Sequence, residues 1–233
     1  MNPIWIIVAI FIGLAVGGSV ISVLYERKRT EAWKQVAGEL GVQFVGDHNA
    51  ILNRCGGMRV FQKGYRRRVK NAICGDAGNV RITVADYSFR TRSSSSGTNS
   101  GSKSKTHRRT VCVLESHELD VPHCYLRPEV MLFDALGSMF GGQDIDFADD
   151  PEFSRAFVLQ GDNESAVREL FDAEVRAWFA ARKGQRFHFE VRGNTLVFHT
   201  GRRRKPQEVR EMMQQALEIM RLLGKQDPAR NAR

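Results

Sequence analysis

The feature that most constrains this chain is an apolar stretch over residues 3–25 that contains no charged side chain. A helix needs about 20 apolar residues to cross the roughly 30 Å hydrocarbon core of a bilayer. A cleaved signal peptide would carry basic residues before its apolar segment and a small-residue cleavage site after it, and neither is found here. The stretch therefore predicts a transmembrane helix, with the lipid bilayer as the partner of residues 3–25.

Basic side chains on one side of the stretch predict its orientation. Arg27, Lys28, Arg29 and Lys34 follow the apolar residues, and no Lys or Arg precedes them. Because basic residues accumulate on the cytoplasmic side of membrane helices, we expect the N-terminus outside and residues 26–233 in the cytoplasm. The predicted location is the inner (cytoplasmic) membrane, which the chain crosses in a single pass.

Three small residues within the stretch bear on self-association. Ala9, Gly13 and Gly17 are spaced by four, which places them on one helix face where two backbones can approach closely. Glycine is also common in membrane helices for other reasons. The sequence is therefore compatible with a homodimer and with a monomer.

Residues 26–233 have the pattern of one α+β domain with an antiparallel sheet and amphipathic helices. Apolar residues that recur at helical spacing from Trp33 predict a helix over residues 30–40. Short segments rich in β-branched and aromatic residues follow and predict strands. These segments are residues 42–45, 58–61, 69–74, 80–89 and 110–115.

Residues 93–105 are dominated by Ser and Gly, cannot bury apolar surface and are expected to form a flexible loop. Because predicted strands flank this loop, we interpret it as a long hairpin connection, with an interdomain linker as the alternative. The last third of the chain predicts further elements. They are a strand over residues 157–159, a helix from Asp162 to about Arg182, a hairpin around Gly193 and a final helix after Pro206.

Charge is distributed unevenly, and the basic part offers a candidate binding surface. Residues 51–110 hold 14 Lys and Arg against 2 Asp and Glu, whereas residues 144–181 hold 10 Asp and Glu against 3 Lys and Arg. Near a membrane, each basic side chain contributes about 1 kcal/mol of attraction to anionic lipid headgroups. Attraction between the two segments within the fold is the alternative explanation. The candidate binding residues are Arg66, Arg67, Arg68, Arg108 and Arg109.

The sequence lacks the usual motifs for catalysis and cofactor binding. It has no phosphate-binding Gly-rich loop, no His-Glu-x-x-His and no Gly-x-Ser-x-Gly, so we expect no cofactor and favour a non-enzyme. Nucleic acid is not an expected partner, because the basic segments lack the aromatic platforms and modules of nucleic-acid readers. The sequence favours a membrane-anchored interaction domain that binds a protein partner or an anionic lipid surface.

An acidic cluster supports a different hypothesis. Asp144, Asp146 and Asp149 are closely spaced, and carboxylates are the ligands that hard cations such as Mg²⁺ and Ca²⁺ prefer. The spacing does not fit an EF-hand loop, which needs Gly at its sixth position and Glu at its twelfth. The alternative function is a metal-dependent enzyme that uses the cluster between Asp144 and Asp150. A surface loop rich in turns and helix caps is the simpler interpretation.

Several short segments together resemble a group of known proteins. These segments are Trp33-x-x-Val36-Ala37-x-x-Leu40-Gly41, Thr110-Val111, Leu126-Arg127-Pro128-Glu129, Asp144-Ile145-Asp146-Phe147, Pro151-Glu152-Phe153-Ser154, Phe157-x-Leu159-x-Gly161 and Val167-Arg168-x-Leu170-Phe171. In them the chain resembles a family of uncharacterised, membrane-anchored bacterial proteins of unknown function. The resemblance covers most of residues 26–233. It implies a natural domain that faces the cytoplasm, and no known activity.

Overall fold

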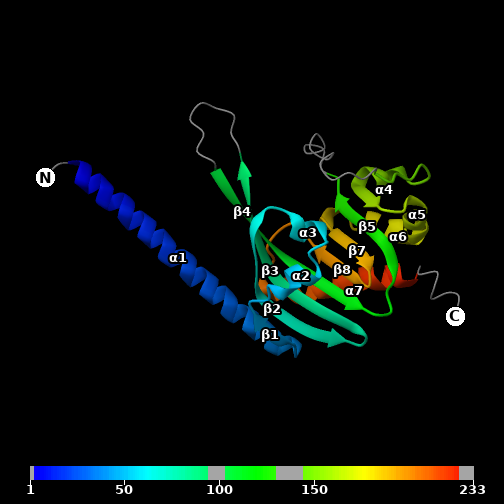
Figure 1. The fold of residues 1–233 in the computed structure, drawn as a ribbon, viewed down its shortest axis with the longest axis horizontal. Helices are drawn as coiled ribbons and strands as arrows, with labels where there is room; N and C mark the ends of the chain where they lie inside the picture. Colours follow the sequence, from blue (N-terminus) through cyan, green and yellow to red (C-terminus); the bar gives the residue numbers. More distant parts are fainter. Residues whose placement is uncertain (1–2, 94–102, 130–143, 226–233) are drawn as a thin grey trace.

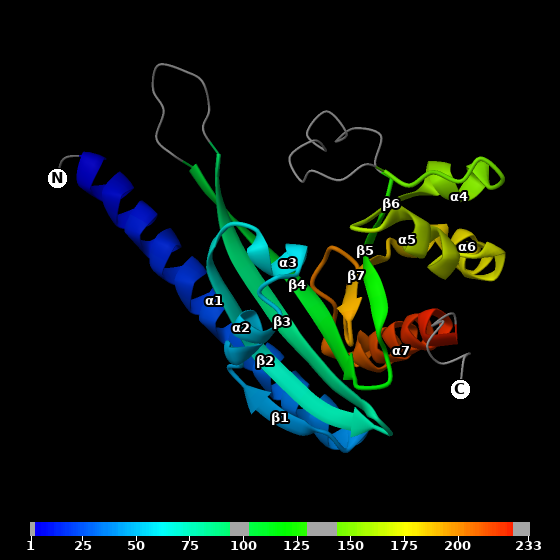
Figure 2. The same cartoon turned by 45° about the vertical axis from the view of Figure 1, so that its right-hand side comes forward.

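The computed structural model describes residues 3–93, 103–129 and 144–225. These residues form an eight-stranded antiparallel sheet with helices on both faces (Figures 1 and 2). The strand order across the sheet is β1-β2-β3-β4-β8-β7-β5-β6. The strands are β1 (Gln43–Gly46), β2 (Tyr65–Ala77), β3 (Val80–Ser93), β4 (Lys103–Ser116), β5 (Val121–Pro128), β6 (Phe157–Gly161), β7 (His188–Gly193) and β8 (Thr195–His199).

The helices divide between the two faces of the sheet. Helices α1, α4, α5, α6 and α7 contribute to one apolar core, and α2 and α3 cover the other face with a smaller core (Figure 2). The helices are α1 (Pro3–Leu40), α2 (Ala50–Arg54), α3 (Arg59–Gln62), α4 (Pro151–Ala156), α5 (Glu164–Leu170), α6 (Ala173–Ala180) and α7 (Val209–Lys225), with 3₁₀ turns η2 (Lys183–Gln185) and η3 (Pro206–Glu208).

Helix α1 corrects the prediction of a transmembrane helix over residues 3–25. In residues 3–93, 103–129 and 144–225, no helix is long and apolar enough to cross a membrane, so the single-pass membrane helix in the predicted fold class is wrong. The apolar stretch is instead one part of a 38-residue helix, whose second half is charged and packs on the sheet through Trp33, Val36 and Ala37. The predicted membrane location and orientation depended on that span and are not tested by the structure.

Strands β2, β3 and β4 form the longest part of the sheet, and their pairing bears on the predicted Ser/Gly-rich loop. The β3–β4 ladder runs without a break from Val80↔Ser116 to Ser93↔Lys103. The strands on either side of the loop are therefore antiparallel partners, as a hairpin connection requires. Residues 94–102 of the predicted flexible loop lie outside the described residues.

Alternation along β3 explains why the sheet has a core on each face. Successive side chains of a strand point to opposite faces. Ile82 and Val84 accordingly lie in the larger core with α1 and α7, whereas Ala85, Tyr87 and Phe89 lie in the smaller core under α2 and α3. The antiparallel sheet predicted from this alternation is present.

Other predicted elements are confirmed in part. The hairpin around Gly193 and the final helix after Pro206 are present as β7–β8 and α7. The helix predicted from Asp162 to Arg182 is two helices, because Asp172 has an extended backbone and its side chain caps α6 by accepting a hydrogen bond from the Val175 N–H at 2.9 Å. The strand predicted over residues 58–61 is the short helix α3, and strand β5 was not predicted.

Candidate anion-binding groove

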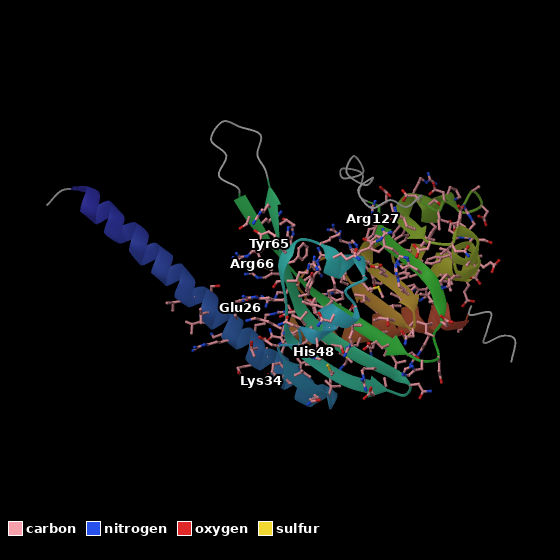
Figure 3. All side chains as sticks on the ribbon, in the orientation of Figure 1. Glu26, Lys34, His48, Tyr65, Arg66 and Arg127 are labelled. Atoms are coloured by element: carbon pink, nitrogen blue, oxygen red, sulfur yellow. The ribbon has the colours of Figure 1, made fainter. Side chains whose placement is uncertain are left out.

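A groove of about 1280 Å³ lies between α1 and the part of the sheet formed by β2, β3 and β4. Figure 3 labels Glu26 on α1 and Arg66 on β2, which line this groove from its two sides. Seven Arg or Lys side chains line it against three carboxylates, so its potential is positive and suits an anionic ligand. The cationic residues are Arg27, Arg66, Arg68, Lys70, Arg90, Arg108 and Arg203.

The register of the sheet places some of these cations side by side on neighbouring strands. Arg68 of β2 pairs with Ser88 of β3, and Ser88 pairs with Arg108 of β4, so the two arginines flank one small polar residue on the same face. Arg66 precedes them at a β-bulge, where its φ of 50° is left-handed and the ladder skips from Tyr65 to Arg68. Arg66 and Arg68 both line the groove.

The five arginines predicted from the sequence do not form one surface. Arg66, Arg68 and Arg108 line the groove. Arg67 does not line it, and its guanidinium donates hydrogen bonds to the carbonyl oxygens of Gln62 at 2.9 Å and Gly64 at 3.1 Å. Arg109 lies on the opposite face of the sheet, where its guanidinium sits 5.2 Å from the centroid of the Phe89 ring.

Asp86 lies at the base of the groove and connects α1 to the sheet. The Arg29 guanidinium donates to both carboxylate oxygens of Asp86, at 2.7 and 2.6 Å. Asn71 at 3.0 Å, Thr110 at 3.2 Å and Arg203 at 3.1 Å complete the set of donors. Burial alone would raise the pKa of Asp86, but the hydrogen bonds from Arg29 and the charge of Arg203 outweigh it, so that the pKa is lowered. Asp86 is therefore a charged, fully paired carboxylate.

Glu26 of α1 is paired in the same way. Arg203 donates to both of its carboxylate oxygens, at 2.7 and 2.6 Å, and this hydrogen bonding lowers the pKa of Glu26. Within the described part of the chain, Arg66, Arg68 and Arg108 by contrast form no salt bridge, and all three are exposed. The groove thus combines paired carboxylates with three exposed arginines that lie open to an external anion.

Sequence reasoning missed Lys70, Arg90 and Asp86, although signals for them were present. Lys70 shares strand parity with Arg68, because residues two apart in a strand lie on one face. Asp86 stands between Ala85 and Tyr87 in a strand that was predicted to be half-buried, and a carboxylate there requires a partner. The partner, Arg29, lies 57 residues away and could not be read from the sequence.

The acidic residues of the alternative hypothesis are held by basic and amide side chains of the same region. Asp149 accepts from Arg176 at 2.7 Å, Asp144 accepts from Gln160 at 2.7 Å, and the Asp146 carbonyl accepts from Arg168 at 2.8 Å. Across the described ranges, no group of three or more His, Cys, Asp or Glu side chains is arranged to hold a metal ion. The metal-dependent enzyme stays a prediction without structural support.

Comparison with known proteins gives a likeness of fold. No protein-family model matches the chain, and no curated protein sequence matches it. Among solved structures, the crystal structure of the mycobacterial trehalose monomycolate transport factor A, TtfA, matches with a TM-score of 0.58. The match covers 86% of this chain and 94% of that one at 12% sequence identity. At this identity the likeness shows a shared fold alone.

Proposed function

We propose that this chain is a non-catalytic binding protein that recognises the acidic headgroup of a lipid in the groove between α1 and strands β2–β4. The observation that carries the proposal is the set of exposed cations Arg66, Arg68 and Arg108 beside carboxylates that are already paired. An acidic headgroup that enters the groove meets exposed guanidinium groups that form no salt bridge with any described residue. Arginine is well suited to such a ligand, because its guanidinium binds phosphate through two parallel hydrogen bonds.

Apolar side chains on α1 support a lipid in preference to a free anion. Val23 lines the groove, and its neighbours along the helix are exposed to a degree that is unusual for large apolar residues. Val20 is 52% exposed, Ile21 68% and Leu24 50%. Exposed apolar surface next to a basic patch is typical of a site for an amphiphile, which presents a charged head and an apolar body.

The structural neighbour accords with this proposal but does not carry it. It is named as a transport factor for trehalose monomycolate. That name describes the neighbour only. The acidic headgroup is inferred for this chain from its own arginines.

Vesicle flotation with the full chain tests the proposal. Phosphatidylglycerol mixed into phosphatidylcholine vesicles provides the acidic headgroup, and pure phosphatidylcholine vesicles measure the background from apolar contacts. The variant R66Q/R68Q/R108Q removes three groove cations. At about 1 kcal/mol for each cation, its partitioning to the acidic vesicles falls on the order of 100-fold relative to the unsubstituted chain.

A charge-matched control separates the effect of the groove cations from the effect of a lower net charge. The variant R67Q/R81Q/R155Q also removes three positive charges, but none of these residues lines the groove. Its partitioning to acidic vesicles should change by no more than about threefold, because cations away from the contact contribute little. Equal losses in the two variants, or no loss in either, would refute the groove as the headgroup site.

A further inference from the structure

A second basic cavity lies on the opposite face of the sheet, between α3 and strands β4, β5, β7 and β8. Its volume is about 270 Å³. It is distinct from the groove, because strand alternation sends Arg108 to one face and the adjacent Arg109 to the other. The basic side chains and histidines that line it are Arg59, Lys63, Arg109, Arg127, His188 and His199.

Basic side chains outnumber acidic ones in the lining of this cavity. Glu190, which is 3% exposed, accepts from the Arg59 backbone N–H at 2.5 Å and is 2.9 Å from His123 Nε2. Four Arg or Lys side chains line the cavity together with this one carboxylate. Burial and the neighbouring cations Arg109 and Arg127 lower the pKa of Lys63, which shows that several basic side chains converge here.

Arg109 has an unused donor in this cavity. Within the described residues, its Nε atom is buried and has no hydrogen-bond partner. Buried donors in native proteins are almost always satisfied, so this guanidinium N–H is available to a partner that enters the cavity. The contact of Arg109 with the Phe89 ring, at 5.2 Å, holds the guanidinium in position for such a partner.

A pair of histidines adds further donors. The rings of His188 and His199 stack with their centroids 4.7 Å apart. His199 Nδ1 accepts a hydrogen bond from the Gly201 backbone N–H at 3.0 Å, so in the neutral ring the proton is on Nε2, which can donate. A Cβ atom at Gly201 would lie 3.4 Å from His188 Nε2, so glycine leaves room beside that nitrogen.

We propose that this cavity binds the phosphoryl group of a small phosphomonoester. The terminal oxygens of a phosphoryl dianion can accept together from guanidinium, ammonium and imidazole donors that converge from different strands. A dianionic phosphoryl group suits a lining of four basic side chains and one carboxylate better than a monoanionic carboxylate does. The cavity is larger than a bare phosphate ion requires, so the group belongs to an organic molecule.

The proposal is independent of the headgroup site in the groove. The phosphoryl group could belong to a soluble metabolite or to a lipid, and the two sources share the chemistry that the cavity recognises. Calorimetric titration of the full chain in a non-ionic detergent, with separate arms for inorganic phosphate, glycerol 3-phosphate and dihexanoyl phosphatidic acid, distinguishes them. Saturable binding that is tightest for glycerol 3-phosphate supports a soluble ligand, and binding that is tightest for the phosphatidic acid supports a lipid.

Variants assign the binding to the cavity. R109Q and K63Q should each weaken binding about tenfold or more, because each removes a charge-assisted hydrogen bond. R81Q, on β3 outside both sites, should leave it unchanged. R109Q and K63Q are both tested so that the result does not depend on one variant being folded. Thermal unfolding of each variant confirms that its chain is folded. No saturable binding in any arm, equal weakening by R81Q, or weakening by R108Q in place of R109Q would overturn the proposal.

Discussion

Replacement of Asp86 by alanine should lower the free energy of unfolding by about 3–5 kcal/mol, as expected when one partner of a buried ion pair is removed. The side chains of Arg29 and Asp86 are each only 6% exposed, so the substitution leaves Arg29 charged in a site that water barely reaches. It also leaves the Asn71 and Thr110 donors without their acceptor. Chemical denaturation at neutral pH, with unfolding followed by circular dichroism, measures the loss.

The effect of D86A should depend on pH in a defined direction. The folded-state pKa of Asp86 lies below its unfolded value of 3.8, so its contribution to stability is complete above pH 3.8 and is lost as the pH falls through the folded value. The stability difference between the unsubstituted chain and D86A therefore shrinks in strong acid. D76A is the control, because Asp76 is an exposed partner of Arg81 and should cost no more than about 1 kcal/mol. Equal losses in D86A and D76A would show that the buried pair does not hold α1.

Replacement of Trp33 by alanine should cost about 3–5 kcal/mol, the range for removal of a large core aromatic. Trp33 is 0% exposed and belongs to the core between α1 and the sheet. In the described residues its buried Nε1 atom has no hydrogen-bond partner, so the cost comes from lost packing and from the cavity left behind. The same denaturation experiment measures it.

Trp33 also positions α1 as one wall of the groove. Arg29, one turn earlier, lies 5.9 Å from the Trp33 ring, so packing and the Asp86 pair act on the same segment. W33F should retain most of the stability, because phenylalanine keeps much of the buried ring. Q35A, at an exposed position of α1, should change stability by less than about 0.5 kcal/mol. A cost below about 1 kcal/mol for W33A would mean that α1 is not docked as described.

The sheet could be predicted from the sequence where a core imposes its pattern. Strand segments 80–89 and 110–115 alternate because both cores take side chains from them. The strands nevertheless continue to Ser93 and begin at Lys103, where the side chains are polar and only the β3–β4 ladder maintains the strand. Val60 and Phe61 of the predicted strand 58–61 instead pack under the sheet from the helix α3, which local β-propensity could not predict.

The sequence predicted which kind of residue forms the binding site, but not how these residues are arranged in space. Clustered arginines indicated an anionic ligand, but adjacent residues of a strand face opposite sides, so Arg108 and Arg109 belong to two different cavities. The separation of Arg108 from Arg109 could have been predicted from the alternation of side chains along a strand. The strand predicted from Thr110 would only have had to begin two residues earlier, at Arg108. Pairing of Asp86 with Arg29 depends on the tertiary fold and left no signal in the sequence. His188 and His199, by contrast, are partners in the β7–β8 hairpin that was predicted around Gly193.

Photo-crosslinking can show whether acidic headgroups bind between α1 and the sheet. A phosphatidylglycerol analogue with a photoreactive headgroup would be bound to the full chain and irradiated, and the crosslinked peptides would be identified by mass spectrometry. We expect crosslinks within residues 66–70, 88–90 and 106–108, the strand segments that carry groove-lining residues. Crosslinks confined to α4, α5, α6 or strand β6, with none in those three segments, would contradict it.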